Sequence, residues 1–270
     1  MVFKLNLHAR FVFQNLFSPC LAFASLIGLI TLQRPALQAP GQSLTEEDYK
    51  TLEADEKIDI EILGKIPALG FDNLVADWLY LQFIQYFGDS DARDLVGYGL
   101  SPEYFKLVSE KDPLFVNALL RLETSTSIFA GYPKISVELL GKSLEKMPEQ
   151  FLSPGTAPYY VWRAKGTNEL LFLADPQAAK ESYKKAVEWA RHSQNDENQN
   201  FINVTTDSIK FLEKNPDSRK AQIGAWLSIL GSSQDAQTFK RVVKEIERLG
   251  GKVTVEPGGQ ISVKVPDDFD

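Results

Sequence analysis

The sequence predicts an all-α protein that begins with a transmembrane helix and ends in a small β-hairpin. Three observations lead to this prediction. Residues 11–33 contain no charged side chain. Apolar residues recur with helical spacing through most of the following chain, as in amphipathic helices. Near the C-terminus, valine and isoleucine alternate with other residues on both sides of a Pro-Gly-Gly turn, which is typical of a hairpin.

The composition is that of an ordinary globular protein, with 44% hydrophobic and 24% charged residues among 270. The formal net charge of −7 leaves no basic surface for a nucleic-acid backbone, so we expect no nucleic-acid partner. The single cysteine, Cys20, excludes an intrachain disulfide framework and a cysteine-rich zinc site. It lies near the start of the apolar run and behind Pro19, which is not the position of a lipidated cysteine.

Residues 1–38 are predicted to be a membrane anchor or a signal segment. The apolar run at 11–33 is long enough for a spanning helix and longer than the usual core of a signal peptide. Lys4 and Arg10 precede it and an acidic cluster follows, so the positive-inside rule predicts a cytoplasmic N-terminus. The main domain would then lie on the trans side, in a periplasm or lumen. Cleavage near Ala39 is the alternative, and it would make the protein secreted or periplasmic.

Residues 39–65 are predicted to be a linker and a leading helix. Proline, glycine and glutamine dominate the first part, which is typical of a flexible tether. Thr45 followed by three acidic residues is typical of a helix start, and we expect this helix to run to about Glu56.

The stretch from Gly70 to Asp89 is rich in aromatic residues, and we predict a helix that is buried on most sides. Its polar residues scatter around the helical wheel instead of gathering on one face. Trp78 and Leu81 are therefore assigned to the packing core. Two alternatives are open: a docking face for a partner or the membrane surface, and an aromatic cofactor pocket. The stretch has no histidine or cysteine, so we expect no cofactor.

Residues 66–195 contain a succession of amphipathic units. The segments 101–113 and 133–148 each end at a proline, and these two prolines lie 35 residues apart. A third unit has the small and aromatic residues of a close helix crossing, at Trp162, Gly166, Ala179, Tyr183 and Ala186. This order and period resemble the tetratricopeptide repeat family, in particular its membrane-anchored bacterial members. The resemblance implies an α-solenoid of stacked helix pairs, with those five residues in the packing core.

The chain departs from the repeat pattern in three places. A long connection occupies 88–100, residues 149–158 are an insertion, and the third unit lacks the closing proline. These departures affect the repeat boundaries more than the expected helices.

The resemblance also implies a binding groove lined by the inner helix of each pair. The matching positions that line its concave surface are Tyr160, Arg121, Ser125, Arg163 and Thr167. The two arginines occupy the same place in successive repeats, so they predict a cationic ladder suited to an acidic peptide. The alternative is that each arginine pairs with a nearby acid, such as Glu123 or Glu169, or extends to water.

The C-terminal part is predicted to differ from the repeats. Residues 196–249 are expected to form further helices, with Gly231 and Gly250 as C-terminal stops. Residues 250–270 are expected to form the hairpin and an acidic tail. Because an isolated hairpin is only marginally stable, it must pack on the last helix or on a partner.

The residue types give little support for catalysis. Histidine occurs only at His8 and His192, and the acidic segment 89–94 departs from a calcium loop at three positions, so we expect no metal and no enzymatic activity. The favoured interpretation is a membrane-tethered helical-repeat scaffold that binds a protein or peptide during assembly or maintenance of a membrane or envelope complex. The alternatives are a permanent structural subunit of a membrane complex and, with less support, a hydrolase with a helical cup.

Overall fold

The computed structural model describes residues 23, 25–28, 30–31, 44–149, 156–193, 198–214, 217–230, 235–255 and 261–264. The chain divides into two compact units, Met1–Thr45 and Glu46–Asp270, and each is described by itself. The described residues between 23 and 31 are helical. Within the described part of the chain, no helix has both the length and the apolar character that crossing a bilayer requires. Most of the predicted anchor, with Cys20, lies outside the described residues and stays a prediction.

The unit Glu46–Asp270 is mostly helical and ends in a two-stranded antiparallel hairpin, as predicted. Its elements are α2 (Glu46–Lys65), α3 (Asp72–Gly88), α4 (Ser90–Val96), α5 (Ser101–Lys111), α6 (Val116–Leu119), the π-helix η1 (Glu123–Phe129), α7 (Pro133–Lys146), α8 (Tyr159–Leu171), α9 (Pro176–His192), α10 (Asn198–Lys214), α11 (Arg219–Leu230), α12 (Ala236–Arg248), β1 (Lys252–Val255) and β2 (Ile261–Lys264).

Local sequence signals set several helix boundaries. The Asp175 carboxylate accepts the backbone N–H of Ala178 at 2.9 Å and caps α9. Asp235 caps α12 in the same way, through Thr238 N at 2.7 Å. Helix α2 ends at Lys65 and is thus longer than predicted, because no proline follows Glu56 until Pro67.

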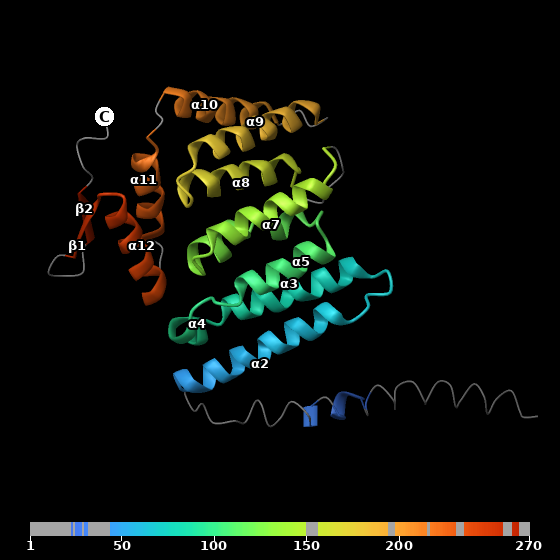
Figure 1. Cartoon of the computed structure of the whole chain (residues 1–270). Coiled ribbons are helices and arrows are strands. Elements are labelled where there is room, and N and C mark those ends of the chain that lie inside the picture. Colours follow the sequence, from blue (N-terminus) through green and yellow to red (C-terminus); the bar gives the residue numbers. More distant parts are fainter. Residues whose placement is uncertain are drawn as a thin grey trace, which may run out of the picture. The chain divides into compact units, whose positions relative to one another are not determined.

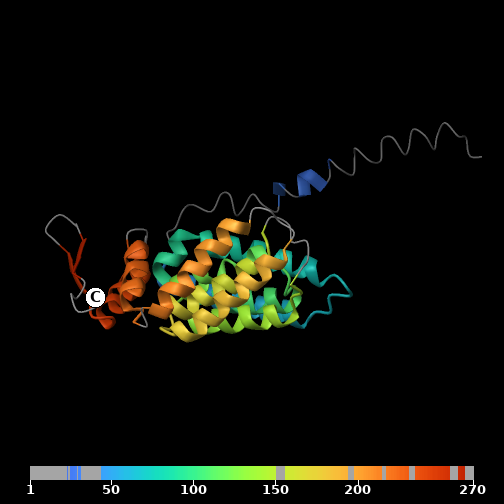
Figure 2. The same cartoon turned by 90° about the horizontal axis from the view of Figure 1, so that it is seen from above.

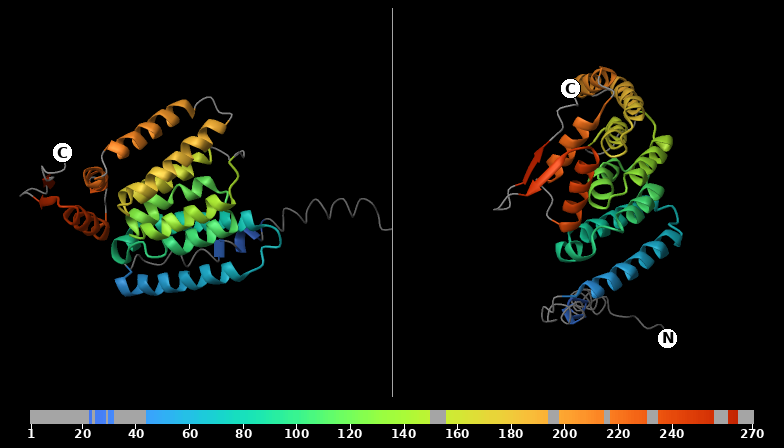
Figure 3. Two further views of the ribbon diagram at one scale, coloured as in Figure 1. Left: turned by 45° about the horizontal axis from the view of Figure 1, so that its top comes forward. Right: turned by 60° about the vertical axis from the view of Figure 1, so that its left-hand side comes forward.

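The helices from α2 to α10 lie side by side in chain order (Figures 1 and 3). The closest packing is between α8 and α9, between α9 and α10, and between α3 and α5. One hydrophobic cluster extends from Ile60 of α2 to Phe201 of α10. Each helix therefore buries its apolar side mainly against helices close to it in the chain.

The crossing of α8 and α9 places small residues where the two backbones approach. Gly166, Ala179, Tyr183 and Ala186 are buried there. A Cβ atom at Gly166 would lie 2.7 Å from the Tyr183 ring and 3.1 Å from the Ala179 carbonyl oxygen. Trp162 is half-buried, with its ring edge-on to that of Trp189 at 5.9 Å.

Helix α3 differs from its prediction. Its buried side consists of Ala76, Leu79, Phe83 and Tyr86, which face the aromatic residues of α5. Trp78 and Leu81, which were assigned to the packing core, are each 54% exposed. The prediction that this helix is buried on most sides is therefore wrong: among the described residues α3 packs mainly on one side, and a second apolar side is left exposed.

The C-terminal segment forms a separate hydrophobic cluster at one end of the other helices (Figure 2). In the hairpin, Val253 pairs with Val263, and both pack against the cluster formed by α11 and α12. The hairpin thus lies on the last helix, which is one of the two expected locations. Gly250 has φ +93° and follows α12, as expected for a C-terminal stop, whereas Gly231 lies outside the described residues.

One long side chain connects this segment to the middle of the chain. Arg241 of α12 donates through Nη1 to the carbonyl oxygens of Ile128, at 2.7 Å, and Phe129. These carbonyl groups lie at the C-terminal end of η1, where the helix leaves them without intrahelical partners. The Arg241 guanidinium therefore caps the π-helix.

Candidate protein-binding surface

The two groove residues predicted in the second unit differ in exposure. Arg121 is exposed, but Ser125 is only 2% exposed, and its hydroxyl donates to the Arg121 carbonyl oxygen at 2.7 Å. The prediction assumed one regular helix, whereas the chain here forms the short α6, a turn and the π-helix η1. This change of helical geometry turns Ser125 inward, so its assignment to the groove surface is wrong.

Two of the three groove residues on α8 contact Phe201 of α10, and all three make contacts within the protein. Tyr160 packs edge-on against the Phe201 ring at 4.8 Å, and the Arg163 guanidinium lies 5.4 Å from the centre of the same ring. Thr167 donates to the Arg163 carbonyl oxygen at 3.0 Å. Tyr160 and Arg163 are thus brought together at Phe201, and among the described contacts none joins them to Arg121.

The acids proposed as arginine partners have different environments. Glu169 is buried, and its carboxylate pairs with Lys165 and accepts the Ser182 hydroxyl at 2.6 Å. Glu123 is largely desolvated, and burial raises the pKa of its carboxyl group, although the positive charge of Arg163 partly opposes this. Arg163 therefore interacts electrostatically with Glu123, whereas Glu169 forms its ion pair with Lys165.

Replacing Glu123 with glutamine should stabilise the protein at neutral pH. Because the folded state raises the Glu123 pKa, this carboxyl group contributes most to stability below its unfolded pKa, about 4.3. That contribution is lost as the pH rises through the folded-state value. Urea unfolding should show a larger gain for Glu123→Gln at about pH 7 than at about pH 4. The exposed Glu145→Gln is the control, and an equal gain for Glu123→Gln at both pH values would contradict the prediction.

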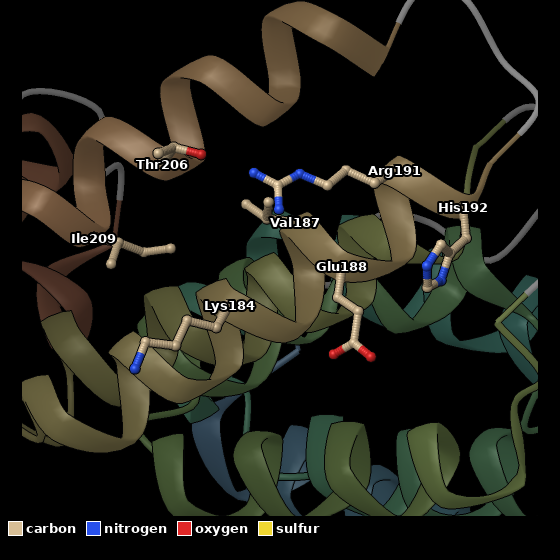
Figure 4. A pocket seen from close by; sticks show the side chains of 7 residues that line it. All are labelled: Lys184, Val187, Glu188, Arg191, His192, Thr206 and Ile209. Carbon is tan, nitrogen blue, oxygen red and sulfur yellow. The ribbon is translucent and has the colours of Figure 1, made fainter.

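A pocket of about 330 Å³ between α9 and α10 has no converging functional groups (Figure 4). Its charged side chains point in different directions from α9, and Thr206 and Ile209 line the α10 side. Glu188 pairs with Lys185 at 2.8 Å, and His192 Nδ1 lies 3.1 Å from Glu149 Oε2. These are exposed polar contacts at the protein surface, and such contacts contribute little to stability.

The most distinctive surface is the outward side of α3. Phe71, Leu74, Trp78 and Leu81 are between 54% and 62% exposed. They are spaced three, four and three residues apart, so they form a continuous stripe along the helix. A single chain rarely exposes so many large apolar side chains on one stripe unless another molecule covers them.

Helix α2 has a second exposed apolar stripe. Ile58, Ile62 and Ile66, which directly follows the helix, lie at four-residue intervals and are between 50% and 54% exposed. Ile62 lines the same pocket, of about 360 Å³, as Trp78 of α3, so the two stripes meet there. Tyr104 of α5 also lines this pocket. We call the surface formed by Ile58, Ile62, Ile66, Phe71, Leu74, Trp78 and Leu81 the α2–α3 face.

Polar contacts hold α2 in place, since Ile60 is its only buried residue among those described. Glu53 accepts the Tyr86 hydroxyl at 3.1 Å and lies 3.4 Å from the Arg93 guanidinium. Glu56 accepts the Tyr104 hydroxyl. These contacts fix the side of α2 that faces α4 and α5, and they leave its isoleucine stripe pointing away.

The exposed charges beside the α2–α3 face are mostly acidic, because Lys57 and Lys65 are outnumbered by exposed acids. Asp55 and Asp59 lie among the isoleucines of α2, and Asp77 precedes Trp78 on α3. All three are exposed, and none forms an ion pair within the described part of the chain. Helix α3 contains no lysine or arginine at all. The surface therefore combines apolar side chains with a local negative charge.

The sequence contained a signal for the α2–α3 face. The heptad-like spacing from Phe71 to Leu81 coexists in α3 with a second apolar stripe, from Ala76 to Tyr86. Two stripes on one helix indicate either burial on two sides or one uncovered side, and the sequence alone does not distinguish them.

Residues suited to metal binding do not gather in the described structure: no three histidine, cysteine, aspartate or glutamate side chains there are placed to hold an ion. Comparison with known proteins adds no assignment, since no family model, no curated protein and no solved structure matches the chain.

Proposed function

We propose that this protein is a membrane-tethered helical-repeat scaffold that binds a protein or peptide partner in the assembly or maintenance of a membrane or envelope complex. The observation that carries the binding role is the α2–α3 face, where seven large apolar side chains are half or more exposed. The charge-free run at 11–33 supports the tether.

The repeat character and the absence of catalysis are part of the same proposal. Helices that pack mainly on their neighbours in the chain support a tetratricopeptide-like stack, as does the close crossing at Gly166. A hydrolase would need converging catalytic groups, but the buried carboxylate of Glu169 is already engaged by Lys165 and Ser182. A binding role therefore fits the described side chains better than catalysis does.

Co-purification from the source cells tests the binding role. We expect the double substitution Trp78→Ala and Leu81→Ala to reduce the recovery of the wild-type partner about tenfold or more, because such central apolar contacts carry about 2 kcal/mol each. Phe211→Ala on α10 is the matched control, since Phe211 is 53% exposed and Trp78 is 54% exposed. Circular dichroism verifies that each variant keeps its helicity.

A second double variant tests the arginine ladder. Loss of the partner in Arg121→Ala with Arg163→Ala, but not in the Trp78 and Leu81 variant, would place binding in the predicted groove and favour an acidic partner. A partner that remains at fixed stoichiometry and does not exchange with added free partner would instead indicate a permanent structural subunit. Retention of the partner by both double variants would contradict both surfaces.

A further inference from the structure

We propose that the α2–α3 face binds a cationic amphipathic helix of a partner protein. This inference rests on the proposed binding function and specifies the shape and charge of what is bound. It differs from the acidic partner that the arginine ladder suggests.

The shape of the face suits a helix. The stripe from Phe71 to Leu81 has the three-four-three spacing with which one helix packs along another. The isoleucines of α2 provide a second row, and the pocket that Ile62 and Trp78 share lies where the two rows meet. At 1.5 Å per residue, the α3 stripe is about 15 Å long, which matches about three turns of a bound helix. Docking of an amphipathic helix into a groove of this kind is a common mode of recognition.

The negative charge beside the face favours a partner helix that carries positive charge. Four exposed acids lie next to the apolar side chains, and they outnumber the two exposed lysines there; α3 contributes no basic residue. The acids are Asp55, Asp59, Glu61 and Asp77, and the lysines are Lys57 and Lys65. A helix whose apolar stripe is flanked by lysine or arginine would place its charges near these carboxylates. A second copy of this chain would bring the same aspartates together and add another net charge of −7. Anionic lipid headgroups would likewise be repelled.

Three synthetic helical peptides test the inference directly. Each has about 18 residues and the same leucine stripe, while the remaining positions are lysine-rich, glutamine-rich or glutamate-rich. Their binding to the full-length protein, held in a phosphatidylcholine nanodisc, is measured by fluorescence anisotropy, with empty nanodiscs as the background. We expect the lysine-rich peptide to bind about tenfold or more tightly than the glutamate-rich peptide, and this ratio to fall between about 50 and about 300 mM salt.

Matched substitutions separate local from overall charge. The triple variant Asp55→Asn, Asp59→Asn and Asp77→Asn should lose most of the preference for the lysine-rich peptide. The control variant Glu145→Gln, Glu213→Gln and Glu247→Gln removes the same charge from exposed positions elsewhere and should keep the preference. The double variant Trp78→Ala with Leu81→Ala should weaken the binding of the lysine-rich and glutamine-rich peptides by similar factors, because both peptides contact the apolar stripe.

The outcomes distinguish this inference from the proposed function. Equal binding of all three peptides, lost in the Trp78 and Leu81 variant, would overturn the charge preference and leave the binding role intact. An equal loss of preference in both triple variants would also overturn it, because overall charge would then suffice. Binding of no peptide, together with self-association that Trp78→Ala abolishes, would assign the face to a second copy. Co-purification that is unaffected by the Trp78 and Leu81 variant would overturn the proposed function itself.

Discussion

Replacing Arg93 with alanine is expected to lower the free energy of unfolding by about 3 kcal/mol. The Arg93 side chain is 5% exposed, stacks 3.8 Å from the centre of the Tyr86 ring and pairs with Glu53. Its removal leaves the Glu53 carboxylate without a cationic partner and also removes the cation–π contact. Because Glu53 retains the Tyr86 hydroxyl and is 20% exposed, the effect should lie at the low end for a buried ion pair.

Urea unfolding followed by circular dichroism measures this effect. The control is Arg248→Ala, which removes an exposed pair with Glu245 and should cost at most about 0.5 kcal/mol. Since Glu53 lies on α2, Arg93→Ala should also weaken binding at the α2–α3 face. Equal stability of the two variants would show that Arg93 does not fix α2.

Replacing Gly166 with alanine is expected to destabilise the protein by about 1–3 kcal/mol. The added methyl group would meet the Tyr183 ring at 2.7 Å and the Ala179 carbonyl oxygen at 3.1 Å, so α8 and α9 would have to separate. The backbone contact matters most, because a carbonyl group within a helix cannot rotate away as an exposed side chain can.

Gly141 provides the matched control for this prediction. It lies inside α7, and a Cβ atom there would meet only the end of Lys165, at 3.7 Å. Gly141→Ala should therefore stabilise the helix by about 0.5–1 kcal/mol, since alanine is the better helix former. Thermal unfolding of the two variants should shift in opposite directions. A gain in stability from Gly166→Ala would contradict the close crossing.

The helices were predictable where the spacing of apolar residues and the positions of prolines indicate the same boundaries. Pro133 opens α7 and Pro176 opens α9, and the alternating apolar residues predicted the hairpin, in which Val253 pairs with Val263. The geometry of the segment predicted as the second repeat was not predictable in the same way. The segment around Ser125 has no proline or glycine to announce a π-helix, and its capping by Arg241 comes from a residue far along the chain. Long-range contacts of this kind leave no local pattern.

The candidate site shows a different limit of the sequence. The scattered polar positions of α3 predicted the helix but not its burial, because residue spacing does not say how many neighbours a helix has. Trp78 and Leu81 have the residue types of a core, and only the placement of α2 and α5 leaves them exposed. The docking alternative for this stretch was open from the sequence, and the exposure of Trp78 and Leu81 is the observation on which the proposed binding role rests.

The cap that Arg241 places on η1 has a consequence for how the chain unfolds. A stack in which each helix contacts only its neighbours tends to fray from its ends, so that separate parts melt at different denaturant concentrations. Arg241 joins residues 113 positions apart, and the rings of Phe172 and Trp226, 5.0 Å apart, add a second link between α11 and the end of α8. The C-terminal helices therefore cannot detach without uncapping the middle of the stack. This coupling favours one concerted loss of structure over stepwise fraying, and it delays the last stage of folding until the end of the chain has been made.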